Sequence, residues 1–323
     1  MTLGLIADTH DAPDPLAPIR ALGRLPADLR VHLGDVASSP TVMALTREFK
    51  TRPDWWERLT PAQRARFTEL IQAGRRDLSA YLAVRLGETP AAQARRRAET
   101  EAAYLAVLPL WRRLRRAWIL AGNVDRLWES TPWFARWRSS VRYLAWPQAR
   151  WLGAGLVVLW PSLPGLTEAG RRRLRAAVRR WARRAQRAAW VVILAHEPPF
   201  RGPTPARYLA NLRAAGLQAT TIPFYSGRNP TADCLLWFCR ALPATLPVGL
   251  AFGHLHDPAP VIAAGTRFLR LREDGGLAFR LYGCGARPPG PGRRTIALFA
   301  VPAGAVATLR ASAEGFLFRW ETV

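Results

Sequence analysis

Short apolar runs that end at polar residues constrain the fold of this 323-residue chain more than any other feature. Each run is five or six residues long, and all except 29–33 lack a regular alternation between polar and apolar residues. Such runs are typical of strands that are buried on both faces, as in a sheet covered by helices. We therefore predict an α/β fold. The runs cover residues 2–7, 29–33, 117–121, 155–160, 190–195 and 248–252.

The segment between the second and third runs has a different character. Residues 40–118 are rich in Ala, Arg, Leu and Glu and contain helix-start signals such as Thr60-Pro61-Ala62-Gln63. We predict a helical insertion or cap over 40–118, within a domain built from residues 1–39 and 119–323. Such a cap is expected to cover a site and select its substrate, and a stabilising or oligomerising appendage is the alternative.

Helices and further strands are predicted between and after these runs. The stretch 15–25 is compatible with a helix, and 171–187 has an apolar stripe at helical spacing, which predicts a crossover helix. After residue 261, short runs between Gly and Pro turns favour antiparallel strands. These runs cover 266–271, 277–282, 295–301 and 315–320.

The charge of the chain is strongly positive. The formal net charge is +24, and Lys50 is the single lysine among 47 basic residues, so 46 are arginine. Nine of these arginines lie within 171–187, where they form either a solvated face or a surface for nucleic acid or anionic lipid. No apolar run approaches the roughly 18 residues that span a bilayer, and the amino terminus does not resemble a secretion signal. We therefore expect a cytoplasmic protein.

Polar residues with metal-binding chemistry follow several of the apolar runs. Each motif alone has an ordinary explanation as a turn, a cap or a buried histidine. Together they are less ordinary, because four of the five histidines of the chain fall within them. The motifs are Asp8-Thr9-His10, Gly34-Asp35, Gly122-Asn123-Val124-Asp125, Ala195-His196-Glu197 and Gly253-His254-Leu255-His256.

The residue types in these motifs predict a pair of metal ions. Mixtures of imidazole and carboxylate suit Mn, Fe or Zn, whereas Ca²⁺ and Mg²⁺ prefer shells made only of oxygen. One four-coordinate ion would leave about three of the candidate ligands unused. Two ions bridged by one aspartate would use all of them. The candidate ligands are Asp8, His10, Asp35, Asn123, His196, His254 and His256.

In their order along the chain, the five motifs resemble those of the calcineurin-like metallophosphoesterase superfamily, and those of its small bacterial phosphodiesterases most. The resemblance implies two packed mixed sheets flanked by helices, with a dimetal centre at the strand ends. It implies that Asp35 bridges both ions. It also implies that one ion is held by Asp8, His10 and His256, and the other by Asn123, His196 and His254.

The third motif departs from the pattern of many members of this superfamily. Val124 stands where they have a histidine that helps to protonate the leaving oxygen, which weakens the interpretation as a phosphomonoesterase. His32, the only histidine outside the motifs, is expected to have a structural or supporting role. Asp125 is a candidate for orienting substrate or water, and Arg126 for clamping a phosphate oxygen, with a surface arginine as the alternative.

These features predict a metal-dependent phosphoesterase that hydrolyses an anionic phosphodiester or pyrophosphate by attack of a metal-bridging hydroxide. Asp35, Asn123, Asp125 and Arg126 are its predicted catalytic residues. A nuclease is the alternative enzyme, and a metal-binding scaffold without activity is the alternative outside enzymes. The sequence leaves the oligomeric state open.

Overall fold

The structure is a computed structural model of the chain. It describes residues 1–75, 77–114, 116–163, 165–197, 230–254, 278–282, 284–285 and 295–323. Contacts between residues divide the chain into two compact units. The larger unit contains residues 1–36 and 109–323, and the smaller unit contains residues 37–108.

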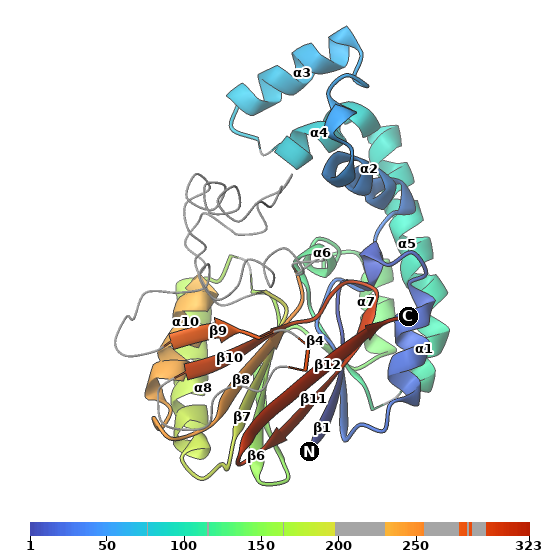
Figure 1. Ribbon diagram of the computed structural model, residues 1–323. Coiled ribbons are helices and arrows are strands. Elements are labelled where there is room, and N and C mark those ends of the chain that lie inside the picture. The colour runs from blue at the N-terminus through green and yellow to red at the C-terminus, as the bar shows by residue number, and fades with distance from the viewer. Residues whose placement is uncertain are drawn as a thin grey trace. The chain divides into compact units, whose positions relative to one another are not determined.

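The described part of the larger unit contains two six-stranded sheets (Figure 1). The first sheet has the order β12-β11-β1-β2-β3-β4, in which β1 to β4 run parallel and the hairpin of β11 and β12 pairs antiparallel with β1. Its strands are β1 (Thr2–Ile6), β2 (Leu29–His32), β3 (Trp118–Leu120), β4 (Tyr143–Leu144), β11 (Ala305–Ser312) and β12 (Gly315–Thr322).

The second sheet has the order β5-β6-β7-β8-β10-β9. All neighbouring strands are parallel except β5 and β6, which form an antiparallel pair. Both sheets are therefore mixed. The strands of the second sheet are β5 (Gln148–Leu152), β6 (Gly155–Trp160), β7 (Val191–Ala195), β8 (Val248–Phe252), β9 (Ala278–Leu281) and β10 (Thr295–Ala300).

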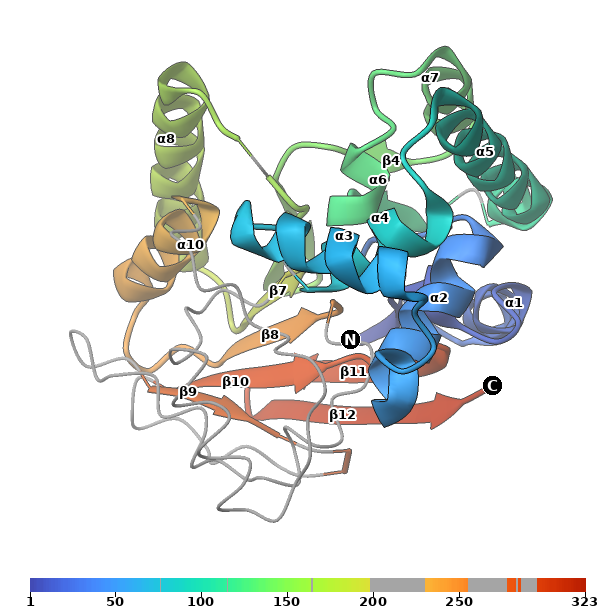
Figure 2. The same cartoon turned by 90° about the horizontal axis from the view of Figure 1, so that it is seen from above.

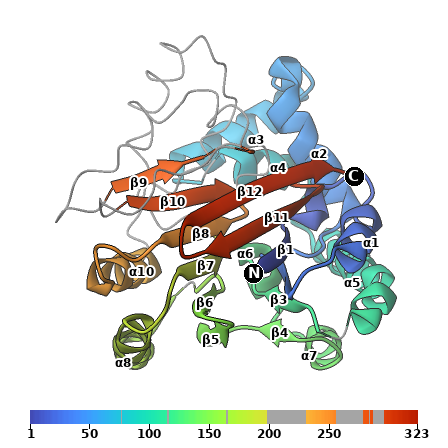
Figure 3. The ribbon, with the colours of Figure 1, turned by 60° about the horizontal axis from the view of Figure 1, so that its bottom comes forward.

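The two sheets pack face to face around a shared apolar core. Leu5 and Val31 of the first sheet and Leu194 and Phe299 of the second belong to one buried cluster. The outer face of the second sheet is covered by α8 (Glu168–Ala185) and α10 (Pro230–Ala241). In Figure 3, α1 (Leu16–Arg24) and α7 (Pro132–Ser139) lie on the opposite side of the sandwich. The α/β class and the two packed sheets are thus as predicted.

The smaller unit is helical. Its elements are α2 (Pro40–Thr51), the 3₁₀ turn η2 (Pro53–Trp55), α3 (Pro61–Gln72), α4 (Asp77–Leu86) and the first part of α5 (Pro90–Arg113). The helices enclose a cluster that includes Phe49, Phe67 and Tyr81. The predicted capping box is present at the start of α3, where Thr60 Oγ1 accepts the amide of Gln63 and the Gln63 side chain accepts the amide of Thr60.

The boundary of the helical unit lies earlier than the predicted residue 118. Pro109 has no amide hydrogen to donate within α5, and the residues from there onward belong to the larger unit. Trp111 is only 2% exposed and makes an edge-to-face contact with His32 of β2. The last turn of α5 therefore belongs to the core beside the first sheet. A role of the helical unit as a lid stays a prediction.

Strand pairing near the carboxyl terminus differs from the sequence prediction. β12, which contains the run 315–320, is antiparallel to its neighbour as expected, but that neighbour, β11, was not predicted, and β9 and β10 pair in parallel. The connection over residues 282–294 is too long for a tight hairpin, which would have enforced the antiparallel arrangement. The run 266–271 lies outside the described residues.

Among the helices that the structure describes, none is both long and apolar enough to cross a membrane.

Candidate metal centre

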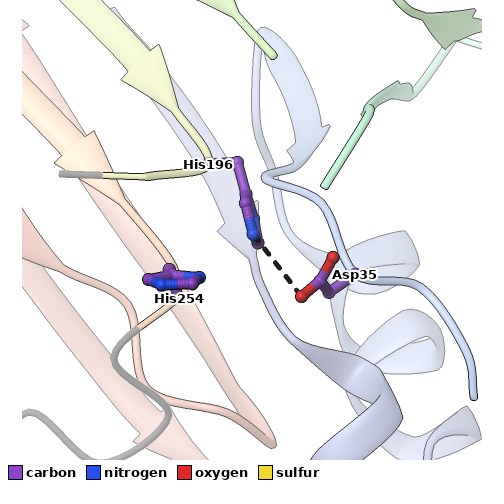
Figure 4. A group of neighbouring side chains, drawn as sticks. All are labelled: Asp35, His196 and His254. Carbon is purple, nitrogen blue, oxygen red and sulfur yellow. Dashed lines mark ion pairs between the residues drawn. The ribbon is translucent and has the colours of Figure 1, made fainter. Parts of the chain in front are cut away.

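Six of the seven predicted ligands gather where strands of the two sheets end. Asp8 and His10 follow β1, and Asp35 follows β2. Asn123 begins the short helix α6 (Asn123–Arg126) after β3, while His196 and His254 follow β7 and β8. Figure 4 shows Asp35, His196 and His254 projecting from three separate segments toward one another. His256, the seventh predicted ligand, lies outside the described residues.

Two groups of ligand atoms share Asp35. One group consists of Asp35, His196 and His254, and the other of Asp8, His10 and Asp35. Within each group the ligand atoms lie within 4.8 Å of one another. Asp35 is therefore placed where a bridging ligand would be needed.

The amide oxygen of Asn123 extends the first of these groups. Asn123 Oδ1 lies 2.7 Å from His196 Nε2 and 3.0 Å from His254 Nδ1. His196 Nδ1 lies 3.0 Å from the carbonyl oxygen of Leu33, so this nitrogen carries the proton and donates it, and Nε2 is directed toward the cluster. Three potential metal-binding atoms, Asn123 Oδ1, His196 Nε2 and His254 Nδ1, therefore converge on one point.

Buried charges in this cluster influence one another strongly. Burial favours the neutral form of the Asp35 carboxyl, yet the neighbouring His196 reverses that effect and holds the pKa of Asp35 below its usual range. Burial likewise opposes the charged form of His196, but the carboxylate of Asp35, 3.5 Å away, raises the pKa of His196 to about 10. Burial raises the pKa of Asp8 to about 7; the neighbouring His196 opposes this shift, and the negative charge of Asp35 adds to it. The buried cluster thus favours a positively charged group next to the Asp35 carboxylate.

This donor set fits divalent metal ions. Without a cation, the short contacts of Asn123 Oδ1 require a proton on each facing imidazole nitrogen. A cation among these atoms would satisfy the oxygen and both nitrogens together. It would also compensate the buried negative charge of Asp35, which burial alone makes costly.

No family model matches the chain, and no curated protein is significantly similar to it. The geometry of the metal centre is therefore the basis on which its function is inferred.

Three of the candidate ligands have left-handed backbone conformations. Among the described residues, Asp8, Asp35 and His254 are the ones other than glycine with positive φ, at 49°, 60° and 69°. Such conformations cost about 1–3 kcal/mol each and persist where surrounding structure enforces them, commonly at functional sites. One such enforcing contact is the backbone amide of His254, which donates to Asp8 Oδ2 over 2.6 Å.

Two motif glycines allow the ligand segments to approach closely. A Cβ atom on Gly122 would lie 2.0 Å from Asp35 Oδ1 and 2.2 Å from the Asp35 amide nitrogen. Gly34 has a φ of 113°, and a Cβ there would lie 2.7 Å from His196 Nδ1. Glycine is therefore required at both positions because a side chain would clash there, and not only because glycine favours turns.

Asp125 has a structural role at the centre instead of the predicted contact with substrate or water. It is fully buried, and its Oδ2 accepts the amides of Asp35 and Gly122 at 2.9 and 2.8 Å. Its Oδ1 accepts the amide of Val36 at 3.0 Å. Asp125 thereby joins the segment after β2 to the segment after β3 and fixes the position of Asp35.

The predicted phosphate clamp at Arg126 is not supported by the structure. The guanidinium donates twice to Glu129, twice to the carbonyl of Ser162 and once to the carbonyl of Ala145, which uses all five of its N–H groups. Arg126 therefore holds the segment after β6 against α6. Its partners are distant in the sequence, so no sequence pattern identified this role.

We expect Arg126→Lys to lower stability without weakening substrate binding. The lysine keeps the charge but has only three donors and no planar fork, so the free energy of unfolding should fall by about 1.5–3 kcal/mol. Urea denaturation measures this loss, with Arg24→Lys at the exposed end of α1 as the matched control. A raised KM for a phosphodiester at unchanged stability would restore the clamp hypothesis.

His32 has the supporting role at the centre that was expected from the sequence. It is fully buried, and burial lowers its pKa to about 3, so the ring is neutral. The amide of Gly34 donates to Nδ1, which leaves Nε2–H to donate to Thr9 Oγ1, and Thr9 in turn donates to the carbonyl of Val36. Thr9 was not predicted as a supporting residue, although it lies between two predicted ligands.

Proposed function

We propose that the protein is a phosphoesterase that uses two divalent metal ions to hydrolyse a phosphodiester or pyrophosphate bond. The observation that carries this proposal is the pair of ligand groups that share Asp35 at the ends of buried strands. Nitrogen and oxygen donors are mixed in both groups, which favours Mn, Fe or Zn. The order of the five motifs along the two-sheet sandwich supports a place in the calcineurin-like metallophosphoesterase superfamily.

The two ions would be held by the predicted ligands. When bound, they supply Lewis-acid chemistry that neutralises phosphoryl charge and makes water acidic enough to serve as a nucleophile near neutral pH. Asp35 would contact both ions. Asp8, His10 and His256 would complete the site of one ion, and Asn123, His196 and His254 that of the other.

Other groups of the chain keep these ligands in position. The amide of Val124 donates to Asp35 Oδ1 over 2.8 Å and fixes the rotation of the carboxylate. His10 Nδ1 lies 3.0 Å from the carbonyl oxygen of Asp35, which orients that ring as Leu33 orients His196. Asn123 provides an oxygen ligand without a negative charge that would repel an anionic substrate.

The substrate class follows from the third motif. Val124 supplies only its backbone amide at the position where a histidine could protonate a poor leaving group. A phosphodiester or pyrophosphate with a good leaving group needs less help from a general acid than an alkyl phosphomonoester does. We therefore assign the diester or pyrophosphate class to this centre.

A direct assay tests the proposed function. Protein stripped with chelator and reloaded with Mn²⁺ should bind two equivalents and hydrolyse bis-p-nitrophenyl phosphate, with slower turnover of p-nitrophenyl phosphate. The stripped protein should hydrolyse neither compound. Two bound ions without turnover of either compound, or of a nucleotide pyrophosphate, would instead indicate a metal-binding scaffold.

A further inference from the structure

The outer face of α8 carries arginines in a line. Arg172, Arg179 and Arg183 are spaced seven and four residues apart, which aligns them over about 16 Å of helix. Arg175 and Arg180 stand beside this line, and all five are exposed. We call these five residues the arginine face.

The opposite side of α8 is already used in folding. Leu174, Val178, Trp181 and Ala185 are buried against the second sheet and α10. Figure 2 shows α8 and α10 adjacent to each other. The arginine face therefore points away from the sheet and is not needed to attach the helix.

The arginine face is not compensated by acidic groups of its own helix. Glu168, in the first turn, is the single acidic residue of α8, and no ion pair in the described part of the chain includes an arginine of this helix. Arginines four residues apart, such as Arg175 and Arg179, repel one another and weaken the helix. A face with only a solubilising role would gain stability from interleaved acids, as occur in the helical unit, where Arg95 pairs with Glu99.

Aromatic rings border the arginine face. The guanidinium of Arg173 lies 5.0 Å from the ring centre of Trp146, and that of Arg184 lies 5.7 Å from the ring centre of Trp151. Trp151 of β5 is nevertheless 42% exposed. On the neighbouring α10, Trp237 is 40% exposed. An exposed tryptophan beside a row of cations, as at Trp151, combines the two components of surfaces that bind single-stranded nucleic acid, where phosphates contact arginine and bases stack on aromatic rings.

We propose that the arginine face of α8, with Trp151 at its border, binds single-stranded nucleic acid. A membrane surface fits less well, because an interfacial helix inserts an apolar face, and the apolar face of α8 is buried against the sheet. The helix links the carboxyl end of β6 to the amino end of β7, so its first turn lies at the sheet edge that carries His196. A nucleic-acid strand bound along α8 therefore runs toward that edge of the sheet.

Binding of a fluorescein-labelled 20-nucleotide strand, followed by anisotropy at increasing NaCl with EDTA present, tests this proposal. EDTA makes the result independent of the metal centre and of the proposed hydrolysis. The quadruple variant R172Q/R175Q/R179Q/R183Q should bind at least about tenfold more weakly at low salt. Its slope of log K against log [salt] should be shallower by about 2 to 3, because each lost phosphate contact removes about 0.7.

Two controls make the outcome specific. The variant R20Q/R24Q/R310Q/R319Q also loses four charges from exposed positions, but outside α8, and should bind nearly as the unmodified protein does. Trp151→Ala should weaken single-strand binding about fivefold or more and leave duplex binding unchanged. The α8 variant should melt no lower than the unmodified protein, because repulsion has been removed. An unchanged salt slope in that variant, or binding to phosphatidylglycerol vesicles without binding to the strand, would overturn the proposal.

Discussion

Asp35→Asn is expected to abolish both the binding of two metal ions and the turnover of a phosphodiester. The substitution keeps the shape of the side chain, and its Oδ1 can still accept the amide of Val124. It removes the negative charge that both ligand groups share. Loss of residues that only support a ligand costs 10–100-fold in affinity or activity, so loss of the shared ligand should lower turnover by more than about 100-fold.

Metal content by atomic emission and turnover of bis-p-nitrophenyl phosphate measure this effect together. Asp54→Asn is the matched control, because Asp54 is an exposed aspartate of the helical unit that pairs with Arg58 at the surface. Circular dichroism of the stripped proteins should show the same secondary structure for both variants. Two bound Mn²⁺ ions and unchanged turnover in Asp35→Asn would refute the role of Asp35 and with it the proposed function.

Gly122→Ala is expected to displace Asp35 and to destabilise the larger unit. The added Cβ would lie 2.0 Å from Asp35 Oδ1. Asp125 holds the Asp35 segment through the amides of Asp35 and Val36, and it holds Gly122 through the amide of Gly122 itself. Because neither segment can retreat without breaking these hydrogen bonds, the free energy of unfolding should fall by about 2 kcal/mol or more. The displaced carboxylate should no longer serve both ions.

Urea denaturation with chelator present measures the loss of stability, and a separate Mn²⁺ titration measures the loss of binding. Gly170→Ala in the first turn of α8 is the control. Its Cβ would lie 3.2 Å from the end of the flexible Leu166 side chain and 3.4 Å from Thr167 Oγ1, and alanine favours a helix over glycine. Equal stability and metal binding in Gly122→Ala and Gly170→Ala would contradict the close approach at Gly122.

The strands that position the metal centre were predictable from the sequence because they are buried on both faces. Residues 155–160 and 190–195, for example, are uninterrupted apolar runs, and β6 and β7 are buried along their whole length. Parallel strands bring their carboxyl ends to one edge, so residues that follow them can be expected to meet. β5 was not predicted, since it is partly exposed and carries Gln148, Arg150 and Trp151 in a short segment.

The residues that organise the centre were harder to predict because their partners are remote in the chain. Asp125 accepts the amide of Asp35 across 90 residues, and Arg126 donates to the carbonyl of Ser162 across 36. Neither contact produces a periodic pattern, and both residues were assigned to catalysis from their proximity to Asn123. Left-handed conformations at Asp8 and His254 likewise depend on contacts that form only in the folded chain.

The pairing of β1 with β11 has a consequence for the order of events during synthesis. β1 carries Asp8 and His10 at its end, yet one of its neighbours in the sheet is made more than three hundred residues later, since Leu3 is paired with Leu309. The amide that secures Asp8 Oδ2 comes from His254, 246 residues away. Nascent chains that stop before β8 therefore cannot assemble the group of Asp35, His196 and His254, so metal binding at this group has to follow translation of most of the polypeptide.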